Sequence, residues 1–99
     1  MAWHDELACP FDDPPAIAAF REGARRGAAM LERSWEWAEI AELAAAVGRG
    51  DYPVRLDEPT EQELRALIDR GVLGAGDAIG AAFRRGYCDA FVRGYSWVA

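Results

Sequence analysis

The packing of this chain depends most on Phe83-Arg84-Arg85-Gly86-Tyr87-Cys88-Asp89-Ala90-Phe91-Val92-Arg93-Gly94-Tyr95, in which Phe-x-Arg-Gly-Tyr occurs twice. In a helix, residues four apart stack on one face, so two neighbouring rows run along this stretch. The small row is Ala82, Gly86, Ala90 and Gly94. The aromatic row is Phe83, Tyr87, Phe91 and Tyr95. We expect the small row to admit a close neighbouring backbone, and the aromatic row to supply buried area.

A second helix with small residues is predicted after Asp12-Asp13-Pro14-Pro15, because aspartate caps free N–H groups and proline is tolerated in the first turn. Its small row is Ala19, Gly23 and Gly27. Glycine inside a helix costs about 1 kcal/mol relative to alanine, so several glycines on one face need a packing reason. We therefore expect 15–33 to pack closely against 78–96, small row against small row. The expected crossing residues are Gly23, Gly27, Gly86 and Gly94.

Shorter helical segments are predicted between these two helices. The apolar face shifts near Arg33-Ser34, so we expect a break or kink there. Thr60-Glu61-Gln62-Glu63 matches a capping box with Thr60 as N-cap, and Gly71 stops the short helix that follows. Asp77 is expected to cap the last helix.

These patterns predict an all-α fold: a small single-domain bundle of three to four helices over residues 1–99, with a closely packed small-residue helix crossing. Residues 1–12 are expected to form an irregular or briefly helical N-terminal arm. Phe20-Arg21-Glu22-Gly23 shares a pattern with Phe83-Arg84-Arg85-Gly86. This is either a faint internal repeat or convergent packing.

The chain has 99 residues and a net charge of −6, and all 11 of its cationic residues are arginine. An acidic chain is a poor non-specific ligand for nucleic acid, because phosphate contact depends on cationic side chains. We therefore expect no direct nucleic-acid partner. The charge either meets a basic protein surface or serves solubility alone.

No apolar run is long enough to span a bilayer, and the N-terminus lacks a basic region followed by an apolar one. We expect a cytoplasmic protein that does not enter the membrane. Cys9 and Cys88 are then expected to be reduced thiols, and a disulfide bond between them is the alternative.

Catalytic and metal-binding patterns are weak. His4 and Cys9 do not have a common metal-ligand spacing, and the chain has a single histidine. Cys88 with His4 has the residue types of a nucleophile pair but lacks an orienting group. We expect no catalytic residues, no metal and no cofactor, and hence no enzyme.

An acidic stripe is the candidate partner-binding site, and it consists of Glu32, Glu36, Glu39 and Glu42. Carboxylates at helical spacing can hold a metal, but such sites usually add a Glu-x-x-His pair, which this stretch lacks. The stripe is either a solvated face or a contact surface for a basic partner, including mimicry of phosphate.

Arg85, Asp89 and Arg93 are spaced for ion pairs along one helix. The neighbouring tyrosines Tyr87 and Tyr95 either belong to a buried aromatic row or stack on RNA bases.

Two short motifs carry a family resemblance. Ala82-Phe83-Arg84-Arg85-Gly86-Tyr87 resembles the opening of ribosome modulation factor, a small helical protein. Cys9-Pro10-Phe11, followed by Phe20-Arg21-Glu22-Gly23, is similar to that family's Cys-Pro-aromatic and aromatic-x-x-Gly patterns, here in reverse order. Similar helices occur in small phage and prophage proteins. In general character the chain also resembles anti-CRISPR proteins, which act by binding.

These observations lead us to expect a non-catalytic protein of phage or mobile-element type that binds and inhibits a host protein complex. The expected partner is basic or nucleic-acid-binding, and an anti-CRISPR role is one form of this expectation. The resemblance implies an alternative, a ribosome-associated factor. A third interpretation is a structural homodimer whose small rows pack between subunits.

Overall fold

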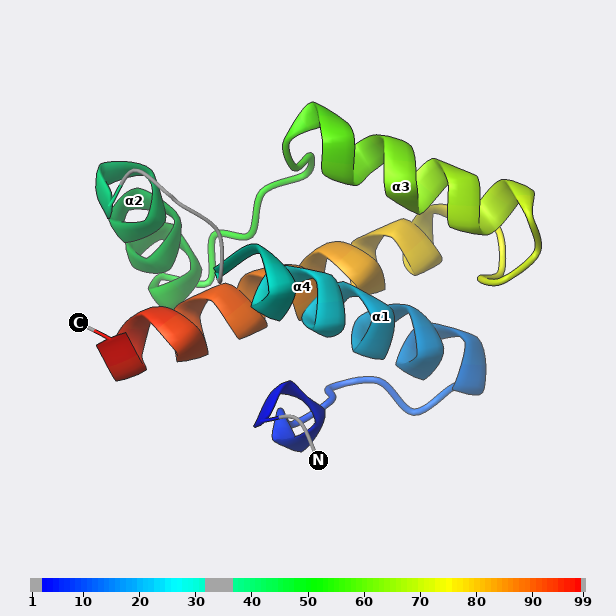
Figure 1. The fold of residues 1–99 in the computed structure, drawn as a ribbon. Coiled ribbons are helices and arrows are strands. Elements are labelled where there is room, and N and C mark those ends of the chain that lie inside the picture. The colour runs from blue at the N-terminus through cyan, green and yellow to red at the C-terminus, as the bar shows by residue number, and fades with distance from the viewer. Residues whose placement is uncertain (1–2, 32–36, 99) are drawn as a thin grey trace.

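The computed structural model describes residues 3–31 and 37–98, and every regular element among them is helical (Figure 1). A short 3-10 helix, η1 (Trp3–Glu6), precedes four α-helices. These are α1 (Pro14–Leu31), α2 (Trp37–Gly48), α3 (Glu58–Asp69) and α4 (Asp77–Val98). The predicted all-α bundle is thus confirmed. The break expected near Arg33-Ser34 lies outside the described residues.

The centre of the molecule is the contact between α1 and α4, whose backbones touch. A Cβ on Gly27 would lie 2.5 Å from the carbonyl oxygen of Tyr87. A Cβ on Gly23 would overlap the carbonyl oxygen of Phe83. Because residue numbers on both helices rise together along the contact, α1 and α4 run parallel (Figure 1). The closely packed small-residue crossing of the predicted fold is therefore present within one chain.

The crossing has an approximate local twofold symmetry. Gly23 lies against the backbone of Phe83, and Gly86 lies against the backbone of Phe20. These contacts relate Ala-Ala-Phe-Arg-Glu-Gly at 18–23 to Ala-Ala-Phe-Arg-Arg-Gly at 81–86. Each of these glycines therefore packs on the turn that carries the other helix's phenylalanine. We expected the glycines of the two small rows to face each other, whereas each of these two glycines faces the backbone of the other helix's phenylalanine.

The two equivalent phenylalanines are both fully buried, but different elements cover them. Phe83 packs with Leu64 and Leu67 of α3. Phe20 packs with Leu7 of the N-terminal arm. The arm and α3 lie on opposite sides of the α1–α4 pair (Figure 1). A nearly symmetric centre thus carries two unlike covers.

The arginine that follows each phenylalanine fastens the corresponding cover. Arg21 donates from Nη1 to the carbonyl oxygens of Leu7, at 2.8 Å, and Asp5, at 3.1 Å. Arg84 donates to the Glu61 carboxylate of α3. The shared Phe-Arg-x-Gly pattern thus supplies a buried ring, an anchoring cation and a close backbone contact in both helices.

The helix starts agree with the sequence in one case and differ in another. Asp13 accepts a hydrogen bond from the Ala16 amide at 3.3 Å, as expected for a cap of α1. The capping box predicted at Thr60 was wrong, because α3 starts three residues earlier with Asp57 as its N-cap. Thr60 is buried, and its hydroxyl donates to Asp57. In the predicted capping box, the Glu63 carboxylate would accept a hydrogen bond from a backbone amide at the helix start. In the structure Glu61 does so instead, and it accepts the Leu56 amide at 2.8 Å.

Candidate functional site

The acidic stripe is only partly described. Glu42 lies on α2 and is exposed, and Glu39 belongs to the same helix. Glu32 and Glu36 lie outside the described residues. Helix α2 packs against the C-terminal half of α4 (Figure 1). The described part of the stripe therefore lies at the end of the bundle that is away from the C-terminus of α3.

Most arginines in the described ranges are held by acceptors of the chain itself. Arg25 and Arg26 both bind Glu22. Arg26 also binds Glu63. The further ion pairs are Arg55–Glu58, Arg84–Glu61 and Arg85–Asp89. The cationic groups are thus largely neutralised where they stand.

Exposed carboxylates are left over by this pairing. Within the described part of the chain, eight of them enter no ion pair: Glu6, Asp12, Asp13, Glu42, Asp51, Asp57, Asp69 and Asp77. The exposed guanidinium groups of Arg49, Arg65 and Arg70 offset part of this charge. The carboxylates that account for the net charge of −6 therefore lie largely on the surface, and they make that surface acidic.

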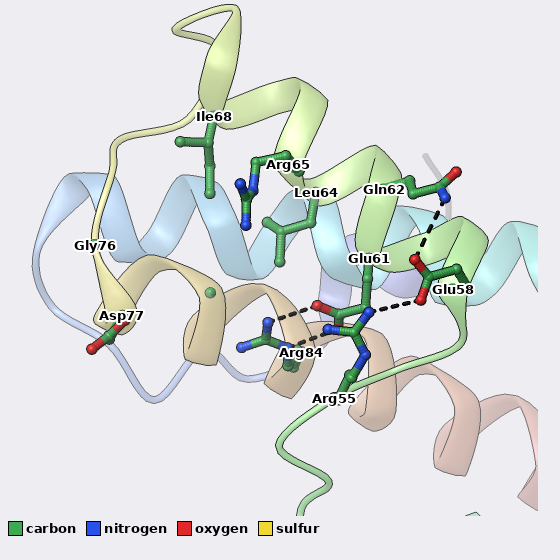
Figure 2. A pocket seen from close by; sticks show the side chains of 11 residues that line it. Arg55, Glu58, Glu61, Gln62, Leu64, Arg65, Ile68, Gly76, Asp77 and Arg84 are labelled. Carbon is green, nitrogen blue, oxygen red and sulfur yellow. Dashed lines mark hydrogen bonds and ion pairs between the residues drawn. The ribbon is translucent and has the colours of Figure 1, made fainter.

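A groove of about 450 Å³ runs between α3 and α4 (Figure 2). Its central feature is the pair formed by Glu61 and Arg84, with Nη2 to Oε1 at 2.7 Å and Nε to Oε2 at 2.9 Å. Gly80 leaves room for this guanidinium, because a Cβ there would lie 3.0 Å from Nη1 of Arg84. The Arg84 hydrogen bonds are the main reason that the pKa of Glu61 is lowered. The pair ties α3 to α4 rather than presenting a free acid or base.

A second polar cluster joins the loop after α2 to α4. The Tyr52 hydroxyl donates to Asp89, and the Arg85 guanidinium lies over the Tyr52 ring, 4.4 Å from its centroid. Burial and the hydrogen bond to Asp89 raise the pKa of Tyr52 to about 12. The Arg85–Asp89 pair was expected from the helical spacing, but Tyr52 was missed. No local signal marks a loop tyrosine as the partner of a helix far along the chain.

The aromatic row of α4 faces inward where its side chains are described. Tyr87 and Phe91 are buried, with ring centroids 4.9 Å apart. Tyr87 is therefore not available to stack on a base. Its hydroxyl donates to Asp57 at 3.5 Å, which adds another link between α4 and the start of α3.

No hydrogen bond joins Cys88 to His4, the candidate nucleophile pair, among the described residues. Both cysteines are free, and Cys88 has no exposed surface. Burial is the main cause that raises the pKa of the Cys88 thiol to about 12, so the reactive thiolate is scarce near neutral pH. His4 instead contacts Trp3 and lies 3.6 Å from Asp5. Among the described residues, no three metal-ligating side chains gather in one place.

Comparisons with protein-family models, curated proteins and solved structures gave no match to this chain. Within the described ranges, no helix combines the length and the apolar character needed to cross a membrane.

Proposed function

We propose that this chain is a non-catalytic protein of phage or mobile-element type that binds and inhibits a host protein complex. The partner is a basic or nucleic-acid-binding protein complex, and an anti-CRISPR role is one form of this proposal. The binding residues are the acidic stripe Glu32, Glu36, Glu39 and Glu42. The protein acts in the cytoplasm.

The observation that carries this proposal is the internal pairing of the arginines. Six described arginines donate to acceptors of their own chain: Arg21, Arg25, Arg26, Arg55, Arg84 and Arg85. The unpaired carboxylates then dominate the outer surface, and such a surface attracts a basic partner and repels nucleic acid. The same pairing gives the ribosome-associated alternative less support, because contact with RNA phosphates needs available cations.

A binding role also agrees with the polar groups of the interior and the groove. The Cys88 thiol is enclosed, and Glu61 is engaged by Arg84. Glu61 is therefore already satisfied by a neighbour, and Cys88 is part of the buried interior. The homodimer alternative has to use surfaces other than the crossing, because Gly23, Gly27 and Gly86 already contact backbone of the same chain.

The proposal is tested by affinity capture from a nuclease-treated lysate of bacteria that carry active defence systems. Capture of a nucleic-acid-binding effector in a fixed ratio supports it. Replacing Glu36, Glu39 and Glu42 by lysine should then abolish capture while circular dichroism still shows a folded helical protein. A matched control reverses three exposed carboxylates elsewhere, Asp12, Asp51 and Asp69.

Equal loss of capture in both triple variants means that net charge alone drives binding, which contradicts the acidic stripe. Ribosomal proteins that disappear after nuclease treatment support the ribosome-associated alternative instead. Undiminished capture by the stripe variant contradicts the stripe as the binding surface.

A further inference from the structure

Helix α3 is attached to the bundle differently from the other long helices. The backbones of α1 and α4 touch, whereas α3 approaches neither helix closely along its length. It reaches them through the side chains of Leu64, Leu67 and Ile68, which lie on one helix face. Figure 1 shows α3 lying apart from the parallel pair.

The surface beneath α3 has the form of a helix-binding groove. Its floor combines small and apolar side chains of both long helices: Ala16 and Ala19 from α1, and Ile79, Ala82 and Phe83 from α4. Open hollows run along both sides of α3. One is the α3–α4 groove of Figure 2, and the other, about 130 Å³, lies between α1 and α3.

Polar ties fasten α3 at the rim of this floor. Glu61 binds Arg84 of α4, and Glu63 binds Arg26 of α1. Both ties join a carboxylate of α3 to a guanidinium of the floor helices. The floor therefore carries one cation on each long helix, positioned for an acidic amphipathic helix.

The connections on both sides of α3 are non-helical. Residues 49–57 form a loop before it, and residues 70–76 form a loop after it. Gly71 and Gly76 in the second loop have φ angles of 74° and 120°, which other residues rarely adopt. Leu73 is the buried anchor in this second loop. Both ends of α3 thus continue into non-helical chain, and the link at its start is the hydrogen bond that Asp57 accepts from Tyr87 of α4.

We propose that α3 is a displaceable cover, and that the floor formed by α1 and α4 is a docking site for an amphipathic helix of a partner protein. The incoming helix has the chemistry that α3 itself shows, Glu-x-x-Leu-x-x-Leu-Ile. Its carboxylate meets Arg84, and its leucines replace Leu64 and Leu67 over Phe83. This site is separate from the acidic stripe and does not depend on it.

The first test is native-state hydrogen exchange on the full chain, read by mass spectrometry. We expect α3 amides to be protected at least tenfold less than those of α1 and α4, because α3 opens without the rest of the bundle. Arg84→Gln should lower α3 protection further and leave α1 unchanged. Arg49→Gln is the matched control, since Arg49 is an exposed arginine that follows α2 and enters no ion pair with α3. Equal protection of α1, α3 and α4 in the unmodified chain overturns the proposal.

The second test adds a fluorescent peptide of residues 56–71 to the full chain. The peptide should bind a Leu64→Ala variant at least tenfold more tightly than the unmodified chain, because that variant's own α3 competes less well. Replacing Glu61 of the peptide by glutamine should weaken this binding, because that change removes the bond to Arg84 and leaves the chain's own α3 unaltered. If Leu64→Ala does not fold, Glu61→Gln replaces it, because it loosens α3 and leaves the floor intact.

The outcomes of this peptide titration distinguish a partner helix from the α3 helix of a second copy of the chain. Saturable binding that depends on the peptide's glutamate supports a partner helix. Absence of binding to a folded variant overturns the docking site. A variant that instead forms dimers, and excludes the peptide, shows that a second copy's α3 takes the floor, which overturns the partner-helix proposal.

Discussion

At the scale of single residues, the same amino acid serves opposite purposes in this chain. Gly23 faces the backbone of Phe83, so any side chain there collides with atoms that cannot move aside. Gly48 ends α2 and has no atom within 4 Å of a built Cβ. The spacing of the small row indicates that Gly23 is a contact residue, and the structure adds which backbone it meets.

This contrast predicts the effect of two matched substitutions. Gly23→Ala should lower the free energy of unfolding by about 3 kcal/mol, because overpacking against a backbone forces the helices apart. Gly48→Ala should leave it unchanged or raise it by up to about 1 kcal/mol, since alanine is the better helix residue. Urea unfolding followed by circular dichroism measures both. Similar values for the two variants are incompatible with a close crossing at Gly23.

The two cysteines provide a second residue-scale prediction. In the folded protein at pH 8, iodoacetamide should label Cys9, which is partly exposed, and leave Cys88 unmodified. Cys88 is enclosed, and its pKa is raised to about 12, so it is both inaccessible and protonated. Peptide mass spectrometry identifies the labelled site, with a urea-unfolded sample as the positive control. Labelling of both cysteines at one rate in the folded state contradicts the burial of Cys88.

At the scale of elements, ionic and hydrogen-bonded ties set where the covers lie. Arg21 holds the N-terminal arm by its backbone carbonyls, whereas Arg84 holds α3 by the Glu61 carboxylate. A carbonyl does not titrate near neutral or mildly acidic pH, but a carboxylate does. The two covers should therefore respond differently to acid.

The α3 tie predicts a loss of stability in acid. The pKa of Glu61 is lowered in the folded state, chiefly by Arg84, so folding favours the ionised carboxylate. This contribution is present above the unfolded glutamate pKa, about 4.3, and is lost as pH falls through the folded value. Glu61→Gln should remove part of the fall in stability below this pH. Thermal unfolding from pH 7 to pH 2 measures it.

The control for this prediction is Glu58→Gln, which alters an exposed pair on the same helix. Exposed pairs contribute little, so its pH profile should follow that of the unmodified chain. If Glu61→Gln leaves the acid limb of the profile unchanged, the Glu61–Arg84 pair does not stabilise α3.

At the scale of the whole molecule, the central contact joins two helices that are far apart in the sequence. The rest of the described chain forms covers over this parallel pair: the arm, α2 and α3 (Figure 1). Without α4, α1 loses the surface that buries Phe20 and encloses Gly23. Short helices in isolation are marginal in water, so stability has to come from this long-range packing.

Truncation tests this dependence. Removing residues 77–99 should abolish the cooperative unfolding transition, because no other described element replaces α4 against α1. Removing residues 1–8 should preserve a cooperative transition with lower stability, by about 2 kcal/mol for the lost burial of Leu7. Calorimetry distinguishes these results. A cooperative transition in the chain without α4 contradicts the central role of the α1–α4 contact.

Local pattern in the chain was enough to predict its helices and their closest contact. Residues spaced four apart share a helix face, so the small rows containing Gly23, Gly27 and Gly86 were visible before the fold was known. Asp13 was recognised as a cap for the same reason, because a cap depends on neighbours three residues away. The α3 cap was placed wrongly because Asp57 and Thr60 both fit locally, and the burial of Thr60 is a tertiary property.

Only the packed structure decided how these parts meet. The parallel direction of α1 and α4 and the different anchoring roles of Arg21 and Arg84 depend on contacts between distant segments. The bond from Tyr52 to Asp89 does so too. Such contacts leave no periodic trace, because the residues that they join are not separated by any regular spacing along the chain. The periodicity of the sequence therefore determines which side of each helix is apolar. Which helix packs against that side depends on how the whole chain buries its apolar surface.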